Sequence, residues 1–201
     1  MVSFPICPSS STAERLLCNQ GVRVQFSGRA PNISYLPMSK FQQLKDGWCG
    51  PASLQYALNA QGIFLSQEKI ASMTGTTLKN GVDPKGIKTF LKKIGIDYQE
   101  LIGNDAFSII KQLNEQIDSG KSAIVDYLDG SKLSWDGHYS VFKKSTGKNL
   151  NVWCPSYDKV RSFPKNKFFK KWKDTKKDGK LFRNWALVLS SRQEYHKQPL
   201  Q

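Results

Sequence analysis

The order of two hydrophobic periodicities along the chain constrains its fold more than any other feature. Between about residues 41 and 119, apolar residues recur at the three- and four-residue spacing of helices that bury one face. From about residue 123 to 190 the pattern changes to short apolar runs separated by turn-forming residues, which indicates strands. Helices first and an antiparallel sheet afterwards predict an α+β domain.

Start and stop signals delimit the expected helices. Pro51 suits the first turn of a helix that has Cys49 at its N-terminal end. Asp83 followed by Pro84 combines a cap with a first-turn proline. The last helix is expected to bury the face that carries Phe107. The four helices are expected at about residues 49–62, 66–75, 83–95 and 105–119.

Four strands are expected after these helices, with residues 145–149 as the turn of a hairpin between the second and the third. They are expected at residues 123–125, 138–142, 150–153 and 185–190.

Length and composition bound the remaining possibilities. The 201 residues suit one domain, which we place at 41–190, between an irregular N-terminal arm at 1–40 and a polar tail at 191–201. No apolar run approaches the roughly 20 residues of a membrane helix. The N-terminus has no basic leader and so no convincing signal peptide, which favours a cytoplasmic location.

The positive charge of the chain is concentrated in one segment. Eleven basic and two acidic residues between Lys159 and Arg183 supply +9 of the net charge of +14. This segment is a possible surface for an acidic partner. Its aromatic residues at helical spacing favour an amphipathic helix that packs them on the sheet, and nucleic acid is therefore the less favoured partner. These aromatic residues are Phe168, Phe169 and Trp172.

Few residues are available for chemistry. The four cysteines form no CxxC pair, which argues against a zinc knuckle, and we expect no metal or organic cofactor. Cys49 at a helix start has the position of an activated thiol, His138 is a candidate base, and the Gln43 amide is a candidate oxyanion donor. Gly50 would leave room for a substrate backbone. From the residues alone, an inert buried thiol, a core histidine and a surface glutamine remain open for these three.

A family resemblance favours the catalytic interpretation. Residues 43–53 (QLKDGWCGPAS) resemble the nucleophile motif of the bacteriocin-processing cysteine peptidases and their free-standing relatives, a papain-like family. Residues 137–141 (GHYSV) are similar to the histidine strand of that family. The resemblance covers roughly residues 40–190 and also includes Phe168, Trp172, Asp174, Thr175 and the closing strand at 185–188.

The resemblance implies a papain-like fold and a thiol hydrolase that acts through an acyl-enzyme. Cys49 would be the nucleophile and His138 the general base. The Gln43 side chain and the Cys49 backbone N–H would stabilise the oxyanion. The family has an orienting Asp just before a Pro, where this chain has Cys154. Asp158 is a candidate substitute.

The missing aspartate leaves three functions open. The first is a peptidase of reduced activity, because a thiol is a weaker acceptor than a carboxylate. The second is an inactive relative that binds a peptide or an acidic partner. The third is transpeptidation on small thiol peptides.

Overall fold

A computed structural model describes residues 23–24, 41–129, 137–175 and 181–190. Apart from residues 23–24, the expected arm at 1–40 lies outside these residues, as do the tail at 191–201 and Cys7, Cys18 and His196. None of the helices that are described is long and apolar enough to cross a membrane.

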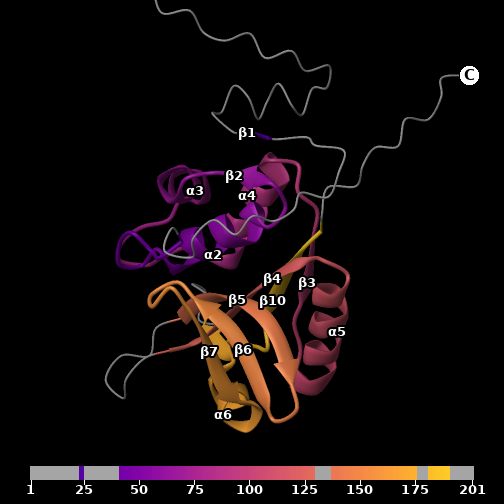
Figure 1. Cartoon of the computed structure of the whole chain (residues 1–201). Coiled ribbons are helices and arrows are strands. Elements are labelled where there is room, and N and C mark those ends of the chain that lie inside the picture. The colour runs from indigo at the N-terminus through magenta and orange to yellow at the C-terminus, as the bar shows by residue number, and fades with distance from the viewer. Residues whose placement is uncertain (1–22, 25–40, 130–136, 176–180, 191–201) are drawn as a thin grey trace, which may run out of the picture.

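A six-stranded antiparallel sheet forms the centre of the molecule (Figure 1). Its hydrogen-bonded order is β3-β10-β4-β5-β6-β7. The strands β3 and β7 are therefore the edges of the sheet, and the last strand of the chain, β10, lies between β3 and β4. These strands span Tyr98–Leu101 (β3), Ser122–Leu128 (β4), Gly137–Thr146 (β5), Asn149–Cys154 (β6), Lys159–Pro164 (β7) and Ala186–Leu189 (β10). Two small antiparallel pairs accompany it, β1 (Arg23–Val24) with β2 (Ile63–Phe64) and β8 (Lys173–Thr175) with β9 (Leu181–Arg183).

Three of the helices begin with a side-chain cap, as their sequences indicate. The side chain of Ser66, Asp83 or Asp105 accepts a backbone N–H of the first turn in each case. These helices are α3 (Gln67–Thr74), α4 (Pro84–Lys93) and α5 (Ala106–Asp118). In α2 (Cys49–Asn59), by contrast, the side chain of the N-cap residue, Trp48, accepts no backbone N–H among the described residues.

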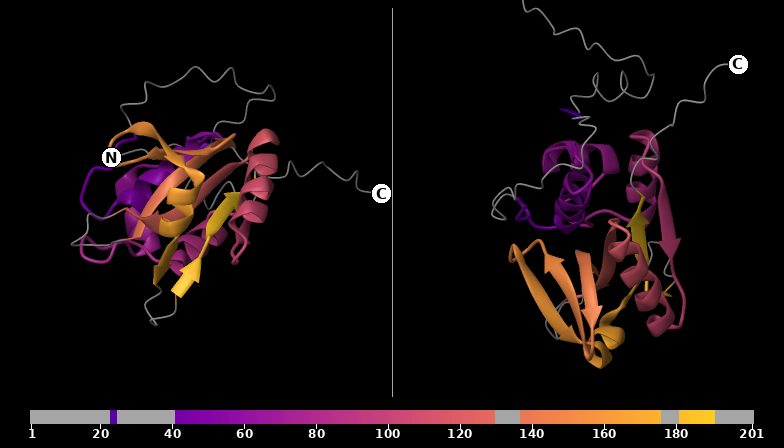
Figure 2. Two further views of the ribbon diagram at one scale, coloured as in Figure 1. Left: turned by 90° about the horizontal axis from the view of Figure 1, so that it is seen from below. Right: turned by 45° about the vertical axis from the view of Figure 1, so that its right-hand side comes forward.

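The helices pack on the sheet in two groups. Side chains of α2, α3 and α4 form one apolar cluster with Ile124, Tyr139 and Leu187. Side chains of α5 and of α6 (Lys165–Lys171) form the other, with the intervening strand residues such as Val125. Alternate residues of each strand face opposite sides, so the two clusters use the two faces of the sheet. In Figure 1 and in the right view of Figure 2, α2 and α3 lie at one end of the strands and α6 at the other.

The structure confirms the α+β prediction and corrects several details. Phe107 is not on the buried face of α5, because its side chain is 67% exposed and contacts Phe169 edge-on. The hairpin turn is shorter than expected, since β5 continues to Thr146 and β6 starts at Asn149.

The basic segment is not one amphipathic helix. It forms the edge strand β7, the seven-residue helix α6 and then β8. The expected burial of its aromatic residues is confirmed for Phe168 and Trp172, while Phe169 is half-buried. The Trp172 indole N–H donates to the carbonyl of Trp185 at 2.9 Å and so joins this segment to the closing strand.

Candidate active site

The candidate site lies where three neighbouring strands meet one end of the sheet. β4 ends at Leu128, β5 begins at Gly137, and these two residues pair in the antiparallel register. β6 ends at Cys154 beside the start of β5. The antiparallel turns therefore gather residues that are far apart in sequence.

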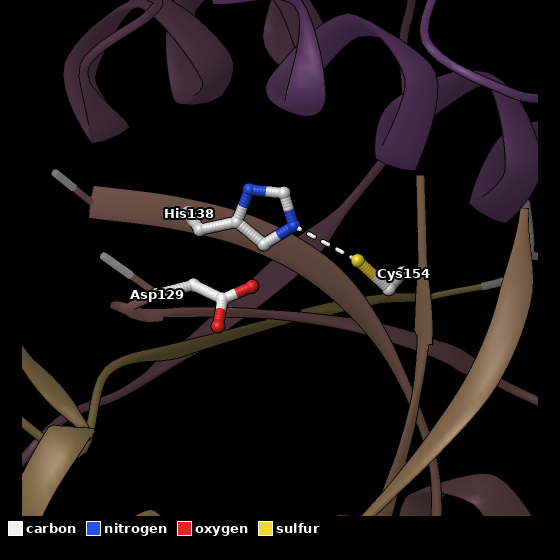
Figure 3. A group of neighbouring side chains, drawn as sticks. All are labelled: Asp129, His138 and Cys154. Carbon is white, nitrogen blue, oxygen red and sulfur yellow. Dashed lines mark hydrogen bonds between the residues drawn. The ribbon is translucent and has the colours of Figure 1, made fainter. Parts of the chain in front are cut away.

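His138 and Cys154 are in direct contact. His138 Nε2 lies 3.2 Å from Cys154 Sγ, and both side chains are buried (Figure 3). The Tyr127 ring packs edge-on against the imidazole, with 5.6 Å between ring centroids. Cys154 thus occupies Nε2 and leaves Nδ1 for a second partner. In Figure 3 this nitrogen points to the side of the ring on which the helices lie.

Asp129 and Arg161 complete this cluster. The oxygens of Asp129, the His138 ring and Cys154 Sγ offer donor atoms that all lie within 4.8 Å of one another. Arg161 Nη1 forms an ion pair with Asp129 and also lies 3.9 Å from Cys154 Sγ. The Arg161 guanidinium stacks on Phe163 and Tyr157, with 4.7 and 5.2 Å to the ring centroids. One guanidinium nitrogen therefore links the carboxylate to the sulfur.

Cys49 is the first residue of α2, and its sulfur lies against β5. The backbone of Tyr139, the residue after His138, offers the thiol a hydrogen bond, and so does the backbone of Gly50. Cys49 is thus close to the start of the histidine strand. It also lies at a helix end whose N–H groups have no intrahelical partners.

Burial shifts the pKa values of Cys49 and His138 in opposite directions. Burial raises the pKa of the Cys49 thiol from 9.0 to about 12, and the hydrogen bond from Tyr139 only partly offsets this. Burial lowers the pKa of His138 below its ordinary 6.5, whereas the Asp129 charge acts to raise it. Each group alone is therefore neutral at pH 7, and both charges are favoured only when they form together as a pair.

Gln43 belongs to a segment that is tied to the residues after Cys154. The Gln43 backbone N–H donates to Pro155 O at 3.0 Å, and the Ser156 hydroxyl donates to Gln43 Oε1 at 2.9 Å. Gln43 Nε2 donates to Lys45 O at 3.3 Å and carries a second N–H. These bonds connect the expected oxyanion donor to the strand end that holds Cys154.

The buried amide of Gln67 holds the same segment from the helical side. It accepts the Leu44 N–H at 3.0 Å and donates to Gln42 O at 2.9 Å and Gln55 Oε1 at 3.1 Å. No sequence signal had singled out Gln67, because a glutamine in the first turn of a helix resembles a surface residue. Its contacts fix the backbone on which Gln43 is carried.

Two glycines near Cys49 are required by packing. A Cβ on Gly50, the next residue, would lie 2.3 Å from Val82 Cγ1, so this glycine makes room for Val82. The room for a substrate backbone that the sequence suggested stays a prediction. Gly47 has φ of +73°, and a Cβ there would lie 2.7 Å from Leu78 O. The turn at residues 76–82 is thereby held tightly against the start of α2.

The carboxylate beside His138 and Cys154 is that of Asp129, which the sequence analysis had not considered. Asp158, the candidate substitute, adopts a left-handed φ of 46° and lies near the Trp153 indole. Burial raises the pKa of Asp158. The signal that could have found Asp129 is its position directly after a buried strand, opposite the start of the histidine strand.

Asp129, His138 and Cys154 have the donor types of a zinc site. Here the Arg161 guanidinium already supplies a positive charge to two of the three, and a cation between them would be repelled by it. The cluster therefore fits an internal ion-pair network better than a metal.

Comparisons with known proteins show the family and the fold of this chain. The model of the Peptidase_C39-like family matches residues 35–180. Among curated proteins the comparison finds no match.

Solved structures share the fold. The peptidase domain of Streptococcus ComA, a bifunctional ABC transporter of a quorum-sensing pathway, is 23% identical with a TM-score of 0.56, over 74% of this chain and 95% of that chain. A Bacillus anthracis protein named a C39-like peptidase is 17% identical with a TM-score of 0.57, over 80% and 96%. A double-glycine-motif protease of an AMS/PCAT transporter, solved with a leader peptide, is 15% identical with a TM-score of 0.51, over 74% and 87%.

The fold is that of a papain-like α+β protein, which this chain shares with these peptidase domains. Within this class, the chain belongs to the Peptidase_C39-like family.

Proposed function

We propose that this chain is a peptidase in which Cys49 attacks a peptide carbonyl and His138 is the general base. The observation that carries the proposal is the contact of His138 Nε2 with Cys154, because it leaves Nδ1 for the thiol at the start of α2. Cys154 takes the third position of the triad. The Gln43 amide and the Cys49 backbone N–H are the proposed oxyanion donors.

The reaction follows from these positions. His138 Nδ1 takes the thiol proton as Cys49 Sγ bonds to the carbonyl carbon, and the carbonyl oxygen becomes the oxyanion. The resulting imidazolium gives its proton to the leaving amine as the C–N bond breaks, which leaves a thioester on Cys49. Water then attacks the thioester while His138 takes its proton. As the C–S bond breaks, His138 returns this proton to Cys49 Sγ, and the acid is released.

Burial supports a proton transfer that is coupled to substrate binding. Cys49 and His138 are both neutral at rest, since their pKa values move apart. When the sulfur bonds to a bound carbonyl as it loses its proton, the negative charge moves to the carbonyl oxygen. The free enzyme then does not need to stabilise a thiolate. The uncapped start of α2 supports the oxyanion role of the Cys49 N–H.

The proposed substrate class is a peptide or protein. The complex of the transporter protease with a leader peptide supports a peptide in the corresponding position.

A peptide library made from a digested proteome tests this function. We expect new peptide termini after incubation with the wild type. The rate of cleavage should fall at least about 100-fold in Cys49→Ala and in His138→Gln, which is the effect of losing the nucleophile or the general base. Cys18→Ala removes a different thiol and should retain cleavage.

The same assay separates the rival functions. Peptide binding that is equal in the wild type and Cys49→Ala, without new termini in either, would favour the binding module over the peptidase. Ligation of an added amine to the acyl fragment would indicate transpeptidation.

A further inference from the structure

We infer that the Asp129–Arg161 pair makes Cys154 a hydrogen-bond acceptor toward His138 and thereby replaces the orienting carboxylate of the family. The inference rests on the proposed roles of Cys49 and His138 and assigns two positioning residues to that site.

The choice that these residues control is the tautomer of His138. If the Cys154 thiol donated its S–H to Nε2, the ring proton would lie on Nδ1. Nδ1 would then be a donor toward Cys49 and could not take the thiol proton. If Cys154 accepts from Nε2–H, Nδ1 has a free lone pair and is a base. Only the second tautomer is productive.

Asp129 and Arg161 together favour the productive tautomer. The Asp129 carboxylate has an oxygen within 4.8 Å of Cys154 Sγ, and its negative charge attracts the hydrogen of the S–H, which would turn a sulfur lone pair toward His138. Arg161 Nη1 lies 3.9 Å from Sγ and is paired with Asp129, so it holds the carboxylate beside the sulfur. The sulfur can then present a lone pair to Nε2–H.

The geometry restrains the pair itself. Arg161 is packed against Phe163 and Tyr157, and its side chain and that of Asp129 are 24% and 14% exposed. Arg161 is on the edge strand β7, and Asp129 follows β4, so the ion pair reaches across the ends of β5 and β6. The carboxylate and the guanidinium are thereby held beside the sulfur that contacts His138 Nε2.

The test uses nitrogen-15 NMR of the histidine side chains in the full chain, because ring nitrogen shifts distinguish the two tautomers directly. The chain has two histidines, and the signals of His138 are assigned from His138→Gln. We expect the wild type to show the Nε2–H tautomer. The double variant Asp129→Asn with Arg161→Met removes both charges together, and we expect it to shift His138 toward Nδ1–H.

The rate of Cys49 alkylation by iodoacetamide gives a second readout. We expect the alkylation rate of the double variant to be about 10- to 100-fold lower than that of the wild type, which is in the range of the effect of losing a general base. Cys154→Asp in the double variant should restore both the tautomer and the rate, because a carboxylate at this position accepts Nε2–H without help. Lys159→Met removes a charge from the same strand and should change neither.

Two outcomes would overturn the inference. One is an unchanged tautomer and rate in the double variant. The other is a double variant that is folded by circular dichroism but in which Cys154→Asp restores neither the tautomer nor the alkylation rate. That result would mean that the pair has only a structural role. A wild type that shows the tautomer and its dependence on the pair but no peptide cleavage would contradict the proposed function alone.

Discussion

His138 is the residue on which the chemistry of the site converges. Its Nε2 contacts Cys154, its ring packs on Tyr127, and the charges of Asp129 and Arg161 act on it in opposite directions. Burial outweighs these charges and keeps the imidazole neutral. A neutral imidazole is the form that can accept a proton from Cys49.

The lowered pKa of His138 predicts how the stability of the fold depends on pH. The unfolded chain takes up a proton on this residue near pH 6.5, while the folded chain does so only at lower pH. Below pH 6.5 the unfolded state therefore binds more protons than the folded state, and the free energy of unfolding decreases as the pH is lowered. His138→Gln should remove this part of the loss.

Urea denaturation at about pH 7.5 and about pH 5 measures the effect. The difference in free energy of unfolding between the two pH values should be larger in the wild type than in His138→Gln. Carboxylates elsewhere contribute equally to both proteins and cancel in the comparison. An equal difference in the two proteins would mean that the pKa of His138 is the same in the folded and the unfolded chain, which would contradict the prediction.

At the scale of elements, the start of α2 is fixed by the turn at residues 76–82. We expect Gly50→Ala to destabilise the fold by about 1–3 kcal/mol, because the added methyl would overlap Val82 Cγ1. In a Val82→Ala background the same change should cost much less. A double-mutant cycle by thermal or urea unfolding measures the coupling.

The matched control for this cycle is Gly103→Ala, where the nearest atom to a new Cβ is 3.9 Å away and no positive φ is involved. Additive effects of Gly50→Ala and Val82→Ala would show that the turn is not what excludes a side chain at residue 50.

The sequence predicts those elements best whose signals are local. Caps and first-turn prolines located the helices to within a few residues, and Cys49 lies at a helix start as expected. The strand β7 was missed because its charged residues hide the alternation of Arg161 and Phe163 with exposed neighbours. Asp129 could have been placed at a strand end from its position in the sequence. Its meeting with Arg161 could not be predicted, because that depends on strand order and register, which no local pattern encodes.

For the whole molecule, the two helical groups explain where a site can form. The clusters on the two faces of the sheet account for most buried apolar side chains. The His138 cluster lies at one end of β4, β5 and β6, where α2 approaches β5. The proposed nucleophile and the proposed base thus come from different layers, and their alignment depends on how the helices pack on the sheet.

The net charge of +14 predicts binding to polyanions that is electrostatic and not specific for bases. Phe168 and Trp172 are buried and cannot stack on bases, whereas Lys167 and Lys170 are exposed. Fluorescence anisotropy should therefore show that oligothymidylate and polyglutamate of similar charge both dissociate between about 50 and about 200 mM salt. Lys167→Glu with Lys170→Glu should weaken both alike, and Phe169→Ala neither. Oligothymidylate binding that survives high salt and is lost in Phe169→Ala would instead reveal a nucleic-acid site.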